Sequence, residues 1–115
     1  MCKLVRLSDK TELMVADIKR DFILNIMDCA SLCKEIKKIV LFGSALEERC
    51  TSDSDIDIAI IGDIARSKFS TNKGYLSFRK KVFGYDLNQD YDMLYFKDNG
   101  EDIVAEGSVI YERKE

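Results

Sequence analysis

The sequence Leu41-Phe42-Gly43-Ser44 ends one apolar stretch, and after ten intervening residues Asp55-Ile56-Asp57-Ile58-Ala59-Ile60-Ile61 begins a second. Both stretches are rich in residues that favour β-strands, and turn-forming residues bound them. Side chains alternate between the two faces of a strand, so Asp55 and Asp57 should project from one face and the isoleucines from the other. The two carboxylates would then lie about 7 Å apart, since a strand rises about 3.3 Å per residue. Such a pair can bracket divalent cations.

Apolar residues at intervals of three and four predict two longer helices. The first covers residues 8–33, with Ser8 or Asp9 as its N-cap, and the second covers residues 72–85. The segment 62–71 is predicted to be a loop or a weak helical turn.

Strand composition recurs between these helices. Strands are predicted at residues 36–42, 55–61, 91–96 and 109–111, with a turn at 98–100 and a helical turn through Ala105. Ser44 and Glu47 fit a capping box that opens a short helix. Helices and strands that alternate in a short chain predict an α/β or α+β fold, in which a small mixed sheet is flanked by helices.

Length and charge narrow the functional classes. The 115 residues predict a single domain, 1–115, with one hydrophobic core. A net charge of -3 argues against a generic nucleic-acid binder, so no direct nucleic-acid binding is expected. No apolar run approaches the roughly 20 residues that span a bilayer, so no membrane association is expected.

The cysteines and the absence of histidine limit the available chemistry. Cys2, Cys29, Cys33 and Cys50 form no Cys-x-x-Cys pair, and free thiols without a signal peptide favour a reducing cytoplasm. The chain contains no histidine, which is the commonest general base. Catalysis would therefore depend on carboxylates and on metals that prefer oxygen ligands.

The spacing of Gly43-Ser44 and Asp55-Ile56-Asp57, followed by a third strand with an acid, resembles the minimal nucleotidyltransferases of the DNA polymerase β superfamily. The closest likeness is to the stand-alone MNT antitoxins that are paired with HEPN-domain toxins. It extends over nearly the whole chain, to an ending like Glu106-Gly107-Ser108-Val109-Ile110-Tyr111-Glu112.

The resemblance implies a polymerase β palm-like fold and a site for two Mg²⁺ ions, with ATP as substrate. Asp55 and Asp57 would bind both ions, and Asp92 would complete the metal site at the attacking hydroxyl. Gly43 and Ser44 would bind the triphosphate. Asp90 is an alternative third acid, but Asp92 lies inside the strand pattern, as the family's acid does.

The implied activity is transfer of AMP to a tyrosine hydroxyl of a partner HEPN RNase toxin, which inactivates the toxin. Family members often carry a basic residue after Gly-Ser and a glycine near the end of the short helix, where this chain has Ala45 and Glu48. Charge repulsion would weaken nucleotide binding there, unless one of the basic residues Arg49, Arg66, Lys68 or Lys73 compensates.

Two other functions stay open. The chain could be a non-catalytic antitoxin that masks its partner, or a nucleotidyltransferase that acts on a small-molecule or RNA hydroxyl. The small size and acidic pI disfavour the latter. Phe69, Tyr75 and Phe83 could supply a homo- or hetero-oligomer interface as well as core packing.

Overall fold

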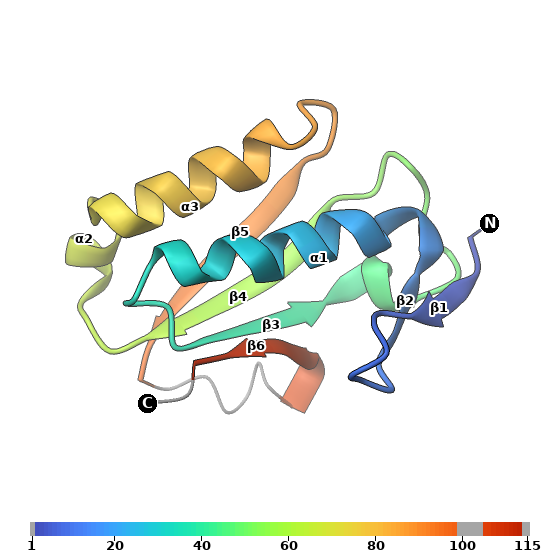
Figure 1. Cartoon of the computed structure of the whole chain (residues 1–115), viewed down its shortest axis with the longest axis horizontal. Helices are drawn as coiled ribbons and strands as arrows, with labels where there is room; N and C mark the ends of the chain where they lie inside the picture. Colours follow the sequence, from blue (N-terminus) through green and yellow to red (C-terminus); the bar gives the residue numbers. More distant parts are fainter. Residues whose placement is uncertain (1, 99–104, 114–115) are drawn as a thin grey trace.

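A four-stranded mixed sheet organises the chain in the computed structural model, which describes residues 2–98 and 105–113 (Figure 1). The strand order is β5-β4-β3-β6. Strand β3 is antiparallel to β4 and to β6, whereas β4 and β5 are parallel. The strands are β3 (Lys38–Phe42), β4 (Ile56–Gly62), β5 (Tyr91–Lys97) and β6 (Ser108–Glu112). The predicted fold class is confirmed.

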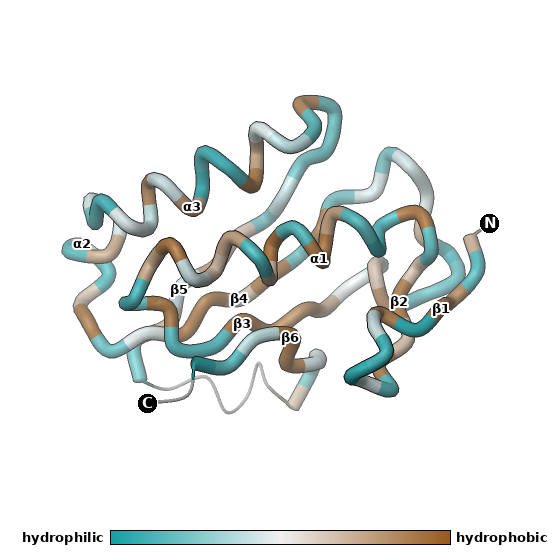
Figure 2. The backbone as a smooth tube through the Cα atoms, in the orientation of Figure 1, coloured by the Kyte–Doolittle hydropathy of each residue, from teal (hydrophilic) through white to brown (hydrophobic). Residues whose placement is uncertain are grey.

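Both long helices cover the same face of this sheet. Helices α1 (Arg20–Cys29) and α3 (Lys73–Gly84) lie side by side there, and the short α2 (Arg66–Phe69) precedes α3 (Figure 1). Ile56, Ile58 and Ile60 of β4 are buried in the core that they form with these helices. Hydrophobic segments accordingly follow β3 and β4 and alternate with polar ones along α1 and α3 (Figure 2). No helix within the described ranges is long and apolar enough to cross a bilayer.

The N-terminal third differs from its prediction as one helix over 8–33. A two-stranded antiparallel sheet of β1 (Leu4–Arg6) and β2 (Met14–Ala16) comes first. A 3-10 turn, η1 (Asp17–Lys19), then leads into α1, and a second, η2 (Ala30–Leu32), follows it. The helix therefore begins 12 residues later than predicted.

Local turn chemistry and strand pairing explain this difference. The Ser8 hydroxyl accepts a hydrogen bond from the Lys10 backbone N–H (3.3 Å), so Ser8 stabilises a turn and does not cap a helix. The Thr11 hydroxyl does the same for Leu13 (3.2 Å). Met14 and Ile18, whose spacing suggested one buried helical face, are exposed, whereas Val15 is buried in the core.

The remaining boundaries lie close to their predictions. Helix α3 begins one residue after Asn72, whose side-chain oxygen accepts from the Tyr75 backbone N–H (3.0 Å) and so caps the helix. Strand β4 begins at Ile56, one residue later than predicted. The predicted turn at 98–100 falls mostly outside the described residues, as does most of the helical turn before Ala105.

Ile58→Ala should lower the free energy of unfolding by about 2–5 kcal/mol, because it removes a fully buried side chain and leaves a cavity. Leu94→Ala is the matched control: Leu94 lies on the neighbouring strand with its side chain 42% exposed, and the expected change is within about 0.5 kcal/mol. Urea unfolding of both variants measures the difference. Equal losses would show that Ile58 does not anchor the core.

Candidate functional site

Asp57 and Asp92 lie side by side in the sheet. They are register partners on the parallel strands β4 and β5. Since Ile56 and Ile58 face the helices, Asp57 projects from the opposite face of the sheet. Ala59 and Ile61 share that face and form a separate small apolar cluster with Val40. The acids therefore occupy the face that α1 and α3 do not cover.

The charge on Asp57 is influenced by its surroundings. Burial raises the pKa of this carboxyl group above its ordinary value, and the negative charges of Asp92 and Asp55 raise it further. Asp55 lies one residue before β4 and is exposed. Asp55 and Asp92 thus lie near enough to Asp57 for their charges to act on it. Asp90, the alternative third acid, is not among the groups that act on Asp57.

The donor chemistry of this group suits a hard cation. Carboxylate oxygens are the ligands that Mg²⁺ prefers, and a cation would relieve the repulsion that raises the pKa of Asp57. The three side chains do not converge into a cage: in the described part of the chain, no three Asp, Glu, Cys or His side chains lie close enough together to hold a metal.

Gly43 lies directly beside Asp57. Phe42, the last residue of β3, is the register partner of Asp57, and Gly43 follows with a φ of 79°. A Cβ atom on Gly43 would overlap the Oδ2 atom of Asp57. Glycine is required here for both reasons, because side-chain-bearing residues rarely adopt a positive φ. The predicted site residue Gly43 therefore adjoins the predicted acids.

The turn after β3 corrects the prediction of a capping box. Gly43–Leu46 form a 3-10 helix, η3, whose N-cap is Phe42 and has no side-chain cap. Ser44 lies inside this turn, so its hydroxyl does not cap the helix. Glu47 instead accepts two hydrogen bonds from Arg49, at 2.7 and 3.0 Å. The turn begins at Gly43, with a positive φ, two residues earlier than a Ser44 cap requires.

Ala45 and Glu48, the two residues that depart from the family pattern, differ in burial. Ala45 is fully buried against the core, so this position contributes packing. Glu48 is exposed. Arg49, a candidate for compensating charge, is engaged by Glu47, and the Arg66 guanidinium donates to the Tyr95 carbonyl oxygen (3.0 Å).

Comparison with known families decides the assignment. The family described as Polymerase beta, Nucleotidyltransferase matches residues 25–115. The chain belongs to this family. The matched region of the nucleotidyltransferase contains all five predicted site residues: Gly43, Ser44, Asp55, Asp57 and Asp92. A comparison with curated proteins gives no match.

A buried brace connects the segments that carry the acids of this nucleotidyltransferase. Lys19, only 1% exposed, donates from Nζ to the Gln89 Oε1 atom (2.6 Å) and to the Ser52 carbonyl oxygen (3.2 Å). Gln89 in turn donates from Nε2 to the carbonyl oxygens of Ser54 (3.1 Å) and Asp90 (2.7 Å). The brace therefore holds the turn before Asp55 against the residues that precede β5.

Sequence reasoning missed both members of this brace. Lys19 falls within the predicted first helix, and Gln89 falls between the predicted helix 72–85 and the predicted strand 91–96. The residues are 70 positions apart, so no local pattern connects them. In a single sequence, a buried lysine such as Lys19 looks the same as the exposed charged residues around it.

Gln89→Leu should destabilise the nucleotidyltransferase by about 3 kcal/mol, since it removes a partner from a buried ammonium group. Lys19→Met should cost about 1–3 kcal/mol, because it leaves buried acceptors unsatisfied but keeps an apolar chain. The double variant should be less destabilised than the sum, with a coupling of about 1–2 kcal/mol in urea unfolding. Strict additivity would show that the two side chains do not act as a unit.

Proposed function

We propose that this nucleotidyltransferase transfers AMP from ATP to a tyrosine hydroxyl of a partner HEPN-domain RNase toxin, with two Mg²⁺ ions as cofactors, in the cytoplasm. The observation that carries the proposal is the register pair Asp57 and Asp92, with Gly43 against Asp57. The tyrosine acceptor and the antitoxin role come from the likeness of the motifs to the MNT antitoxins.

Each site residue has a distinct role in this proposal. Gly43 lets the triphosphate approach the backbone, and the Ser44 hydroxyl, which is not used as a cap, donates to a phosphate oxygen. Asp55 and Asp57 hold the metal ions, and Asp92 orients the attacking hydroxyl and accepts its proton. Bound Mg²⁺ would neutralise the triphosphate and the leaving oxygen.

The reaction balances without a further reactant. The tyrosine oxygen forms a bond to the α-phosphorus of ATP, the bond between the α-phosphorus and its bridging oxygen breaks, and pyrophosphate leaves. The tyrosine proton passes to Asp92 and then to water. The product is a phosphodiester that links AMP to the partner.

A labelling experiment tests this proposal. The purified protein is incubated with α-labelled ATP, Mg²⁺ and the HEPN-type protein encoded beside it, and the label on the partner is measured. We expect Mg²⁺-dependent labelling of a tyrosine, which Asp55→Asn with Asp57→Asn abolishes. Absence of label from the partner, or label that survives this double variant, would contradict the proposal.

Masking of the partner without chemistry is a second candidate. Ala45 and Glu48 favour it, because neither supplies the positive charge that a triphosphate needs. Toxin neutralisation by the same double variant separates the two functions. Full protection without the carboxylates supports masking, whereas lost protection with an intact complex supports chemistry.

The molecule whose hydroxyl receives AMP can also be tested separately. A small-molecule or RNA hydroxyl would take the label in place of the partner's tyrosine if the activity is present but directed elsewhere. Adding total RNA and an aminoglycoside to separate reactions tests these acceptors.

A further inference from the structure

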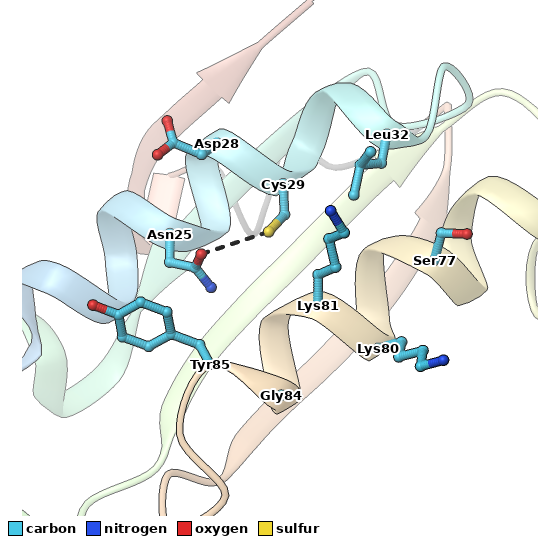
Figure 3. A pocket seen from close by; sticks show the side chains of 9 residues that line it. All are labelled: Asn25, Asp28, Cys29, Leu32, Ser77, Lys80, Lys81, Gly84 and Tyr85. Carbon is cyan, nitrogen blue, oxygen red and sulfur yellow. Dashed lines mark hydrogen bonds between the residues drawn. The ribbon is translucent and has the colours of Figure 1, made fainter.

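A cavity of about 680 Å³ lies between α1 and α3, on the helical side of the sheet. This volume is within the range of small-molecule sites. Figure 3 shows that α1 and η2 supply one wall and α3 the other. The lining residues are Asn25, Asp28, Cys29, Leu32, Ser77, Lys80, Lys81, Gly84 and Tyr85. Because Asp57 and Asp92 project from the opposite face of the sheet, this cavity is separate from the acidic site.

The Asn25 side chain holds an unused donor at the wall of this cavity. Its Nδ2 atom is shielded from solvent and has no hydrogen-bond partner among the described residues. The Oδ1 atom of the same amide accepts from the Cys29 thiol (3.7 Å, Figure 3). Burial raises the pKa of the Cys29 thiol, so the thiol keeps the proton that it donates. A buried polar group without a partner is costly, and a ligand that accepts from Nδ2 once the amide turns toward the cavity would remove this cost.

Two lysines bring positive charge to the cavity near the Asn25 amide. Lys81 extends from α3 toward Cys29 and Leu32 across the cavity, and its charge lowers the pKa of the Cys29 thiol, against the larger effect of burial (Figure 3). Lys80 lies on the same wall. Neither lysine forms an ion pair within residues 2–98 and 105–113, and Asp28 is the one acid among the lining residues.

The surrounding sequence is also basic. Residues 64–85, which include α2 and α3, contain six basic residues and no acidic one, whereas the other 93 residues contain 12 basic and 21 acidic. An anion approaching this otherwise acidic protein is therefore attracted to the helical side.

The rest of the lining suits a flat, weakly polar group. Leu32 and the ring of Tyr85 are both partly exposed beside the donors. Gly84 adds open space, since a Cβ atom there would meet nothing within 4 Å. Ser77 and Tyr85 add hydroxyl donors to the cavity. An anion with three or more acceptor oxygens can therefore use more of the donors here than a carboxylate with two.

We propose that the cavity between α1 and α3 binds a small phosphate monoester with a flat apolar body. The phosphate oxygens accept from the Lys81 ammonium and, once the Asn25 side chain turns toward the cavity, from its amide. The apolar body packs against Leu32 and Tyr85. This binding does not depend on the nucleotidyl-transfer chemistry.

Phenyl phosphate is the probe, titrated into ¹⁵N-labelled protein without divalent metal. We expect saturable shifts of the Asn25 side-chain amide and of the Gly84 and Lys81 backbone amides. Lys81→Met should weaken binding about tenfold or more, the loss expected for one charge-assisted hydrogen bond. Gly84→Ile, which places a bulky side chain in the cavity, should also weaken it about tenfold or more. Gly84→Ala and Lys68→Met are the matched controls, and both should bind like the parent protein.

Asp57→Asn separates this site from the acidic one and should leave the titration unchanged. The proposal is overturned if no shift saturates, or if inorganic phosphate or phenol alone binds as tightly as phenyl phosphate. It is also overturned if Lys68→Met weakens binding as much as Lys81→Met, which would indicate diffuse attraction. Melting temperatures of the variants confirm that each one is folded.

Discussion

Asp57→Asn is expected to abolish nucleotidyl transfer and, at the same time, to raise the melting temperature of the metal-free protein. The activity is expected to fall by about a thousandfold or more, because Asp57 is a proposed metal ligand and such a ligand contributes several kcal/mol to transition-state stabilisation. Stability rises because burial, Asp92 and Asp55 all disfavour the charged carboxylate, and asparagine carries no charge. Thermal unfolding with EDTA and the labelling assay measure the two effects.

The sign of the pH dependence follows from the raised pKa of Asp57. Between the ordinary value of 3.8 and the higher value in the folded state, the folded protein keeps a proton that the unfolded chain has released. The contribution of Asp57 to stability therefore falls as the pH rises through this window, and the loss persists at neutral pH. The advantage of Asp57→Asn should be greatest at neutral pH and disappear below 3.8.

Mg²⁺ provides the internal control for this prediction. Added Mg²⁺ should raise the melting temperature of the parent protein more than that of the variant, because ligands that bind only the folded state stabilise it. A variant that is less stable than the parent in EDTA at neutral pH would show that Asp57 makes a favourable interaction that the charges around it do not reveal.

Gly43→Ala should remove activity and destabilise the fold. The substituted residue would have to adopt a φ of 79°, which costs roughly 1–2 kcal/mol for a residue with a Cβ atom. Its Cβ atom would also overlap the Asp57 carboxylate and lie 3.2 Å from the Asp57 Cγ atom. Either the turn or Asp57 must move, and both contribute to the site. Urea unfolding and the transfer assay measure the loss.

Gly84→Ala is the matched control for Gly43→Ala. Gly84 is the last residue of α3, and a Cβ atom there meets nothing within 4 Å. Alanine has the higher helix propensity, so this variant should be as stable as the parent or slightly more stable. If the two alanine variants behaved alike, the close approach of Gly43 to Asp57 would have no functional importance.

Local patterns predicted the parts of the fold that local interactions determine. The bounds predicted for strand β4 and helix α3 agree with the structure within one residue, because an isoleucine-rich stretch marks the strand and apolar residues at helical spacing mark the helix. The pair Asp55 and Asp57 was recognised from the same alternation. The pairing of Asp57 with Asp92 follows from the parallel register of β4 and β5, which only the structure provides.

Non-local contacts account for what the sequence did not reveal. Residues 14–16 form a strand because Leu4–Arg6 pairs with them, although their own spacing favours a helix. The brace of Lys19 and Gln89 and the cavity between α1 and α3 both depend on how distant segments pack. None of these contacts leaves a period or a motif in a single sequence.

The buried isoleucines of β4 determine where the Asp57 carboxylate lies in the sheet. A shift of the strand by one residue would place Asp57 in the apolar core and expose Ile56, Ile58 and Ile60, at a cost of several buried side chains. Apolar burial on one face thus sets the position of a charge on the other. Slippage of β4 along its neighbours is prevented by residues that never touch a substrate.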